Sequence, residues 1–302
     1  MSEPSAHLSL AVLASSSSGN ASVLRVVDRA GRLHYFALDA GLSPKRTLAA
    51  YGSLGVQGQH VAGVLVTHLD ADHWHAGWLA AMPDQARVHL HSRHLSRAER
   101  LGVTYLRTNV LPVDETGKPG HAFGTFDLCE GVRVRWILND HDDHGSVSYR
   151  VDHCSGASVG FVTDLGVVSA GLVQLMRGVS VLAVESNYCP RMQQASTRPA
   201  FLKERIMGGR GHLSNEQSAA FVRAVQPRDA LALLHLSREC NTPETVLVHH
   251  QHDVATYVTS PDSGTPWLDA TSRSSDHDES KMDEQPVVAV RTFSGQGMLF
   301  RP

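Results

Sequence analysis

An apolar, β-rich run at residues 61–66 ends abruptly in a segment of metal-ligating side chains. That segment reads Thr67-His68-Leu69-Asp70-Ala71-Asp72-His73. Four of its seven residues carry an imidazole or a carboxylate. A buried strand delivers the residues that follow it to the edge of its sheet, so these side chains should gather there. Because such donors are typical of hydrolases that use divalent metals, the segment predicts a metal centre at a sheet edge.

Three later apolar runs also end in potential ligands. The runs and the residues beyond them are 132–138 with His141, 158–162 with Asp164, and 230–234 with His235. A single ligand-type residue at a strand end is usually structural. Four strand ends that all carry such residues indicate a shared centre, and we predict that they converge.

Helical patterns alternate with strands along the chain. Ser214-Asn215-Glu216-Gln217 has the form of a capping box and predicts a helix through about Val225. Shorter helices are expected at 44–51, 74–82 and 199–207. Strands that come first in each half, with helices interspersed, favour sheets covered by helices over an all-β barrel.

The composition is that of a globular protein with a bias towards metal binding. A chain of 302 residues with 42% hydrophobic content can fill a large core, and the 6% aromatic fraction means that this core rests mainly on Ala, Val and Leu. A net charge of −3 gives no global sign of a nucleic-acid or membrane binder. The nineteen histidines favour a metalloprotein.

No targeting or membrane segment stands out. The four cysteines are scattered without a C-x-x-C pair. No apolar run approaches the ~18 residues of a membrane span. We therefore expect a cytoplasmic protein with reduced thiols and no membrane partner.

The order of the ligands resembles a known family. His-x-Asp-x-Asp-His, a later lone His, a strand-terminal Asp and a strand-terminal His are similar, in this order, to the metal motifs of the metallo-β-lactamase superfamily. Over about residues 7–270 the chain further resembles the YycJ/WalJ-like branch. The segments that carry this resemblance include 14–20, 39–43, 163–166, 185–187, 234–237 and 265–268. Gly211-His212-Leu213-Ser214-Asn215 is the most specific of them.

The resemblance implies an α+β fold, an αβ/βα four-layer sandwich with two mixed β-sheets, formed by residues 1–270. It also implies two divalent metal ions at the edge shared by the sheets, with a metal-bridging hydroxide as nucleophile. Members of this branch are described as DNA exonucleases or related phosphodiesterases. The resemblance therefore suggests a metal-dependent hydrolase, most specifically a DNA exonuclease, with DNA as its partner.

Carried over residue by residue, the resemblance assigns seven metal ligands. One metal would be held by His68, Asp70 and His141, the other by Asp72, His73 and His235, with Asp164 bridging. Asp70 departs from the pattern, because most of the superfamily has a second His there. A carboxylate hardens the site and shifts its preference from Zn²⁺ towards Mn²⁺ or Mg²⁺. The same change leaves the occupancy of the first metal open.

Four residues are expected to act on the substrate. Asp72 would orient the attacking water. His212 would neutralise or protonate the phosphate oxygens, since it precedes a helix N-terminus that attracts anions; the alternative is that it packs in its loop. Asn187 would bond either a ligand or the loop backbone, and Ser214 would contact substrate at the start of the helix.

Other histidines and arginines have weaker assignments. His144 is an alternative ligand to His141, although the His-Asp pair of the family pattern favours His141. His89, His91 and His94 match no family metal position and are expected at the surface or behind the ligands. A basic segment contacts phosphates or lies on a solvated helix face; it consists of Arg87, Arg93, Arg97, Arg100 and Arg107.

The composition changes towards the C-terminus. Residues 271–285 are rich in Ser, Asp and Glu and are expected to form a flexible linker. In the tail, residues 286–302, the peptide Gln296-Gly297-Met298-Leu299-Phe300 resembles the Gln-x-x-Leu-Phe motif that binds the bacterial sliding clamp. The Gln would bond a rim while the Leu and Phe fill a pocket. The alternative is that residues 287–293 add a strand to the core.

Two other functions fit the same residues. A hydrolase of a small thioester, lactone or cyclic phosphodiester would use the same fold, and it would act on small esters but not on DNA ends. The second alternative function is that of a non-catalytic adaptor associated with DNA or the clamp. It fits the sequence because Asp70 weakens one metal site. Such an adaptor would bind fewer than two metals.

Overall fold

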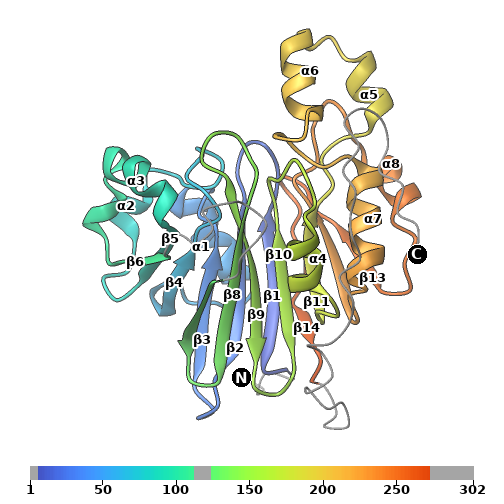
Figure 1. Cartoon of the computed structure of the whole chain (residues 1–302). Helices are drawn as coiled ribbons and strands as arrows, with labels where there is room; N and C mark the ends of the chain where they lie inside the picture. Colours follow the sequence, from blue (N-terminus) through green and yellow to red (C-terminus); the bar gives the residue numbers. More distant parts are fainter. Residues whose placement is uncertain (1–5, 112–123, 273–302) are drawn as a thin grey trace.

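Two seven-stranded sheets face each other in the computed structural model of the chain, which describes residues 6–111 and 124–272 (Figure 1). The first sheet has the spatial order β14-β1-β2-β3-β4-β5-β6. Its strands are β1 Leu8–Ala14, β2 Ala21–Val27, β3 Leu33–Leu38, β4 Val61–Leu65, β5 Arg87–His91, β6 Thr108–Leu111 and β14 Leu268–Ala270. Pairing is antiparallel from β14 to β3 and parallel from β3 to β6, so the sheet is mixed.

The second sheet is mixed as well and has the order β13-β12-β11-β10-β9-β8-β7. Its strands are β7 Gly124–Cys129, β8 Val132–Asn139, β9 Ser146–His153, β10 Ser158–Val162, β11 Val181–Glu185, β12 Ala230–Leu234 and β13 Ala255–Val258. Strands β10 to β13 run parallel, and β7 to β10 pair antiparallel.

Helices cover the outer faces of both sheets (Figure 1). Those on the first sheet are α1 Pro44–Ser53, α2 Trp78–Ala81 and α3 Leu95–Leu101, and those on the second are α4 Ala170–Met176, α7 Asn215–Val225 and α8 Pro243–His249. Two more stand beyond one end of the sandwich, α5 Pro190–Ala195 and α6 Ala200–Met207. Short 3₁₀ turns are η1 Gly58–His60, η2 Ser92–His94 and η3 Val103–Tyr105.

The two-residue period of the strands separates the core into layers. In β2, Leu24 and Val26 face the other sheet, whereas Val23, the residue before Leu24, packs with the helices of the outer layer. Trp136 and Tyr149 are fully buried between the sheets. Each sheet is therefore apolar on both faces, which confirms the expected four-layer α+β sandwich.

One expected helix is much shorter than its pattern predicts. The apolar content of residues 74–82 favours a helix throughout, but α2 begins only at Trp78. Trp74 forms a parallel β-bridge with Ala40, and the amide of His75 donates to the Ala40 carbonyl (2.8 Å). These tertiary bonds hold the chain extended beside the end of β3 and so override the local preference.

Among the residues that the structure describes, none of the helices has the length and apolar character that a membrane span requires. The peptide 296–300 and nearly all of the expected linker lie outside the described residues. The division at residue 270 and clamp binding by the tail therefore stay predictions.

Candidate metal centre

The carboxyl ends of five strands meet at one edge of the sandwich. Strands β3 and β4 are parallel neighbours in the first sheet, as are β10, β11 and β12 in the second. Parallel neighbours end at the same edge of a sheet, so the residues that follow them come together. Donor atoms from all seven residues predicted as ligands lie in groups at this edge: His68, Asp70, Asp72, His73, His141, Asp164 and His235.

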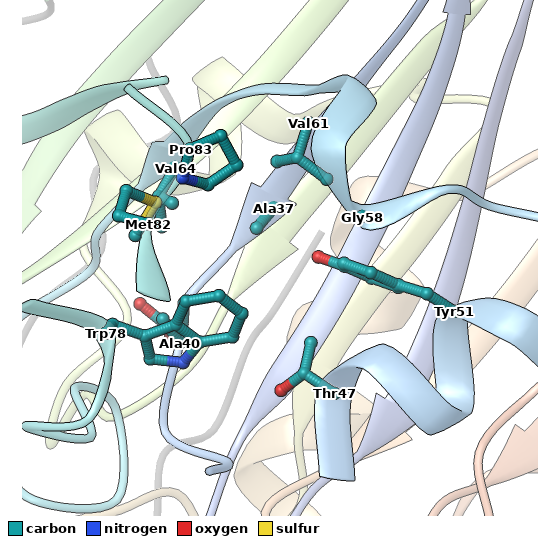
Figure 2. Close-up of a pocket in the computed structure, with 11 residues that line it drawn as sticks. Ala37, Ala40, Thr47, Tyr51, Gly58, Val61, Val64, Trp78, Met82 and Pro83 are labelled. Atoms are coloured by element: carbon teal, nitrogen blue, oxygen red, sulfur yellow. The ribbon is translucent and has the colours of Figure 1, made fainter. Parts of the chain in front are cut away.

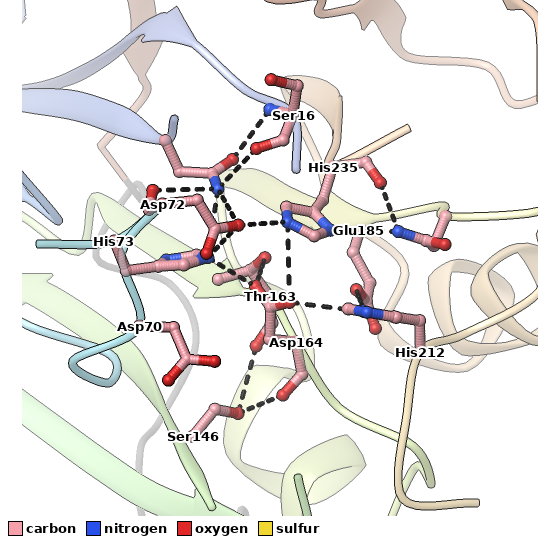
Figure 3. A network of polar contacts seen from close by, with 12 residues as sticks. Ser16, Asp70, Asp72, His73, Ser146, Thr163, Asp164, Glu185, His212 and His235 are labelled. Atoms are coloured by element: carbon pink, nitrogen blue, oxygen red, sulfur yellow. Dashed lines mark hydrogen bonds and ion pairs between the residues drawn. The ribbon is translucent and has the colours of Figure 1, made fainter. Parts of the chain in front are cut away.

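Asp164 occupies the middle of this centre (Figure 3). Its Oδ2 lies 3.0 Å from Nε2 of His73. Its Oδ1 lies 3.6 Å from Nε2 of His235 and 3.9 Å from Nε2 of His141. Because its two oxygens face different partners, this buried carboxylate can be shared by two cations.

The donors include two sets of three, one of which contains Asp164, and a further group of Asp164, Glu185, His212 and His235 overlaps them. Within each set the donor atoms lie within 4.8 Å of one another, and the sets are His68, His141 and Asp164, and Asp72, His73 and His235. Oδ2 of Asp72 is 3.2 Å from Nε2 of His235. These sets correspond to the two predicted halves of the site, with Asp70 left out of the first.

Asp70 lies at the rim of the centre. Its Oδ2 is 3.8 Å from Nε2 of His68, whereas its Oδ1 is only 2.7 Å from Nη1 of Arg97. Asp70 forms a separate donor group with His141 and Asp142. The ion pair with Arg97 therefore holds one oxygen of this carboxylate away from the other ligands.

Three residues at strand ends adopt a left-handed backbone that non-glycine residues rarely use. Their φ angles are 59° for Asp39, 53° for Asp164 and 55° for His235. Such a conformation costs about 1–3 kcal/mol and persists where the surrounding structure enforces it. It turns the chain sharply as it leaves β3, β10 and β12, at the edge where the donor groups gather.

Two imidazoles have their Nδ1 occupied, which leaves Nε2 free to bind a metal. Nδ1–H of His141 donates to the carbonyl of Gly211 (2.9 Å). Nδ1–H of His68 donates to the hydroxyl of Thr67 (3.1 Å), whose own hydrogen is used elsewhere. Metal-binding histidines are commonly oriented by a bond at the second nitrogen. The donor set therefore fits divalent cations.

Asp39, which follows β3, orients the segment that carries the candidate ligands His68 and His73. The sequence did not predict this role. Its Oδ2 accepts the Nδ1–H of His73 (2.7 Å). Its carboxylate also accepts the amide (2.8 Å) and the hydroxyl (2.9 Å) of Thr67. Asp39 thus acts on His73 directly and on His68 through Thr67.

The electrostatics of the centre favour positive charge. Burial lowers the pKa of His68 well below its usual value, and the neighbouring His73 adds to this, so His68 stays neutral. Burial opposes protonation of His73 too, but Asp164 and Asp39 outweigh it and raise the pKa of His73 well above normal. The imidazoles around Asp164 hold its pKa well below its usual range despite burial. The carboxylates of Asp39 and Asp164, which attract a proton to His73, also attract a metal cation.

The serine-rich loop after β1 supports the same ligands, which the sequence pattern did not predict. The side-chain amide of Asn20 lies 3.1 Å from Nε2 of His73 and 3.3 Å from the carbonyl of Asp72. The hydroxyl of Ser15 accepts the amide of His235 (2.8 Å). The run of small polar residues between β1 and β2 was the only feature of the sequence that could have indicated this supporting role.

His212 faces the centre from the loop before α7. Its Nδ1–H donates to Oε2 of Glu185 (3.2 Å), and Oδ1 of Asp164 is 3.3 Å away. Burial opposes a charge on His212, but Glu185, Asp164 and Asp72 outweigh it and raise its pKa to about 9. Glu185 is itself buried, and its Oε1 accepts the amides of Leu165 and Leu213 (both 3.0 Å). Glu185 was missed as a positioning residue.

The two other predicted substrate contacts have partners within the protein. Nδ2 of Asn187 donates to the carbonyl of His235 (2.7 Å) and lies 3.0 Å from its Nδ1. The hydroxyl of Ser214 accepts the amide of Gln217 (3.2 Å), while its own amide donates to the Gln217 side chain (2.9 Å). Asn187 thus holds the loop of His235, and Ser214 completes the predicted capping box.

The remaining histidines lie outside the donor groups of the described residues. His144 lines the groove beside His141. The structure buries His89, His91 and His94, so the surface alternative for them is excluded. Burial lowers the pKa of His89 and of His94 to about 4, which keeps both neutral.

A small cavity has Ala37, Asp39 and Ala40 among its lining residues, at the end of β3 (Figure 2). Its volume is about 20 Å³, and Tyr51, Trp78 and Met82 are among the residues that line it. A space of this size holds about one water molecule. It is a packing void and not a substrate site.

The segment that contains the whole centre matches a known family. Residues 34–236 match the family described as "Beta-lactamase superfamily domain". The chain belongs to the metallo-β-lactamase superfamily. The matched segment reaches from β3 to just beyond His235 and includes every residue of the two donor sets. This member of the superfamily is therefore a metal-dependent hydrolase.

Relatives within the superfamily are similar over most of their length. The chain is 28% identical over 239 residues to "Exodeoxyribonuclease YycJ" of Bacillus anthracis, which covers 78% of this chain and 85% of the relative. It is 26% identical over 268 residues to "Exodeoxyribonuclease WalJ" of Streptococcus pneumoniae, which covers 84% and 95%. The metallo-β-lactamase fold protein YhfI from Bacillus subtilis superposes with a TM-score of 0.60 at 10% identity over 85% of this chain and 99% of that one. The last likeness concerns the fold alone.

Proposed function

We propose that this chain is a phosphodiesterase that degrades DNA from strand ends with the help of two divalent cations. The observation that carries the proposal is the pair of donor sets around Asp164, because two cations that share a carboxylate suit phosphoryl transfer. DNA as the substrate is supported by two relatives named exodeoxyribonuclease that align over 85% and 95% of their length.

The donor sets suggest how the cations would be held. His68, His141 and Asp164 would hold one cation, with Asp70 at the rim as a further ligand, and Asp72, His73 and His235 would hold the other beside Asp164. When bound, the cations would neutralise the phosphate and lower the pKa of a water molecule. The carboxylate of Asp70 adds a hard oxygen donor to the site of His68 and His141. Such a donor favours Mn²⁺ or Mg²⁺ over Zn²⁺ at that site.

Two side chains of the centre are suited to proton and water handling. In the hydrolysis, the water oxygen forms a new P–O bond and gives up a proton to the solvent, the bond to the departing sugar oxygen breaks, and that oxygen takes up a proton. Asp72 is about one-quarter exposed, so a carboxylate oxygen that faces solvent can orient the attacking water. His212 is held through Nδ1 by Glu185, keeps Nε2 free, and carries a proton that the departing oxygen can receive.

The experiment that tests this function uses end-labelled single- and double-stranded DNA and RNA. Each substrate is incubated with Mn²⁺, Mg²⁺ or Zn²⁺, and closed circular DNA serves as a substrate without ends. We expect shortening of linear DNA from an end, no cutting of closed circles, and loss of activity in Asp72→Ala. Asp28→Asn is the matched control, since Asp28 is a buried carboxylate that binds His34 (2.8 Å) outside the metal centre.

The outcomes separate the proposal from its competitors. Cleavage of closed circles would indicate an endonuclease. Hydrolysis of small esters or cyclic phosphodiesters without action on any polynucleotide would indicate a small-molecule hydrolase. The absence of metal-dependent cleavage of every substrate would overturn the proposal.

A further inference from the structure

A groove of about 830 Å³ opens directly from the metal centre. Its inner end is lined by His68, Asp70 and His141. The groove is also lined by Arg97 of α3 and by Phe201 of α6. A polymer whose scissile phosphate lies at the metal centre would extend along this groove.

Phe201 is unusually exposed for an aromatic side chain, at 73%. The apolar side of α6 is already occupied, because Leu202 and Ile206 pack with Tyr188 in a small cluster of their own. Phe201 is outside that cluster and lines the groove instead. An aromatic face in this position can stack on a flat ligand group such as a nucleobase.

Three arginines line the same groove and can meet the phosphates of a strand: Arg97, Arg205 and Arg210. Each is paired with a carboxylate, the closest pairs being Arg97 with Asp70 (2.7 Å) and Arg205 with Asp142 (2.5 Å). A guanidinium has five N–H donors, so one that bonds a carboxylate retains donors for a phosphate. Arg205 and Arg210 are 60% and 65% exposed.

We propose that the groove holds an unpaired stretch of the substrate strand, with a base stacked on Phe201 and phosphates bound by Arg97, Arg205 and Arg210. This inference rests on the proposed nuclease function and names its substrate class. Stacking on a side chain needs a base whose face is free, so the site selects single-stranded or frayed ends over blunt duplexes. The recognition is independent of sequence, because every base offers an aromatic face.

Binding of fluorescent single-stranded oligonucleotides tests the assignment by anisotropy. The full chain is used with Asp72→Asn and Mn²⁺ so that the strand stays intact, with and without Phe201→Ala. Each protein is titrated with a thymidine oligomer and with the same oligomer made abasic at its terminal positions. With Phe201 present, removal of the bases should weaken binding about 5- to 100-fold, the range of one stacked base. Phe201→Ala should lose a similar factor on the intact strand and become insensitive to base removal.

Two further variants make the result specific. Phe201→Trp should retain the affinity and its dependence on bases. Tyr105→Ala removes an aromatic side chain that is 92% exposed but outside the groove, and it should bind as the parent does. Equal affinity of Phe201→Ala for the intact strand, or the same loss on base removal with and without Phe201, would overturn the inference.

Failure of this inference is distinguishable from failure of the proposed function. If the wild-type protein shortens DNA with a metal while Phe201→Ala degrades single-stranded ends equally well, only the assignment of the groove is wrong. If the wild-type protein acts on no polynucleotide with any metal, the nuclease function and the groove assignment fall together.

Discussion

The carboxylate of Asp70 is bonded to the guanidinium of Arg97 at the rim of the metal centre, with 2.7 Å between Oδ1 and Nη1. Asp70 follows β4, whereas Arg97 belongs to α3, and both side chains are about one-third exposed. The other carboxylate oxygen of Asp70, Oδ2, lies 3.8 Å from Nε2 of His68. Arg97 therefore competes with a cation for Asp70 and also repels cations by its charge.

Replacement of Arg97 by Gln should raise the affinity with which the centre binds the weaker of its two Mn²⁺ ions. Both effects of the guanidinium have the same sign, and a partly exposed ion pair contributes at most about 1 kcal/mol, so the gain should reach at most about fivefold. Isothermal titration of the metal-free protein with Mn²⁺ measures it. Arg100→Gln is the control, because Arg100 lies on the same helix and bonds Ser96. Weaker or unchanged Mn²⁺ binding in Arg97→Gln would contradict the competition.

Asp39→Asn should weaken metal binding about 10- to 100-fold, the usual effect of losing a carboxylate that orients a histidine ligand. The substitution removes the charge behind His73 while keeping the size of the side chain. Metal content after dialysis against graded Mn²⁺ or Zn²⁺ is the measurement. Asp28→Asn removes a comparable buried carboxylate beside His34 and should leave metal content unchanged. Similar metal loss in both variants would point to general destabilisation.

Glu185→Gln should move the alkaline limb of the pH–rate profile to lower pH. Glu185 is a principal cause of the raised pKa of His212, about 9, so its removal lowers that pKa and the proton is lost at lower pH. The profile of kcat between pH 6 and 10 measures the shift. His212→Asn should reduce kcat about 10²- to 10⁴-fold, the contribution of a general acid. An alkaline limb that stays in place in Glu185→Gln would exclude His212 as its source.

Gly41→Ala should disrupt the centre through the backbone. A Cβ at Gly41 would lie 1.8 Å from the carbonyl oxygen of Asp72, so the ligand segment has to move away. We expect loss of Mn²⁺ binding and of at least 10²-fold in hydrolysis, since displacements of about 1 Å have such effects. Gly52→Ala adds a Cβ where nothing lies within 4 Å and should have no such effect. Normal metal binding in Gly41→Ala would contradict the close approach.

His250 should make the protein less stable as the pH falls. Burial, with help from His252 and His249, lowers the pKa of His250 to about 3 in the folded protein. The unfolded chain takes up this proton near pH 6.5, so stability is complete above that value and declines as the pH falls towards 3. Between pH 7.5 and 5 this one group accounts for about 2 kcal/mol. Urea unfolding in EDTA should therefore show a smaller acid loss for His250→Gln, and equal losses would contradict the assignment.

Much of the fold was predictable because strands and caps are local. The apolar runs before His141, Asp164 and His235 are strands in the structure, and the capping box at Ser214 starts α7. The segment before α2 was mispredicted, because its conformation depends on a bridge between Trp74 and Ala40 that no local pattern encodes.

The candidate site was predictable in its donors but not in its supports. A histidine or aspartate directly after an apolar run is visible in one stretch of sequence. The partners that orient it come from other strands: Asp39 reaches His73 across 34 positions, and Glu185 reaches His212 across 27. Such pairs depend on which strands are neighbours, so spacing along the chain does not reveal them.

The sequence by itself determined which residues are candidate metal donors and the alternation of strands and helices, because ligand chemistry and side-chain period belong to individual residues and short segments. Only the tertiary structure decided that two sheets end at a common edge, that left-handed residues turn the chain there, that Arg97 engages Asp70, and that Phe201 lines the groove. The physical reason is that these relationships arise from the pairing of parallel strands and the packing of the layers, which bring together side chains far apart in the chain.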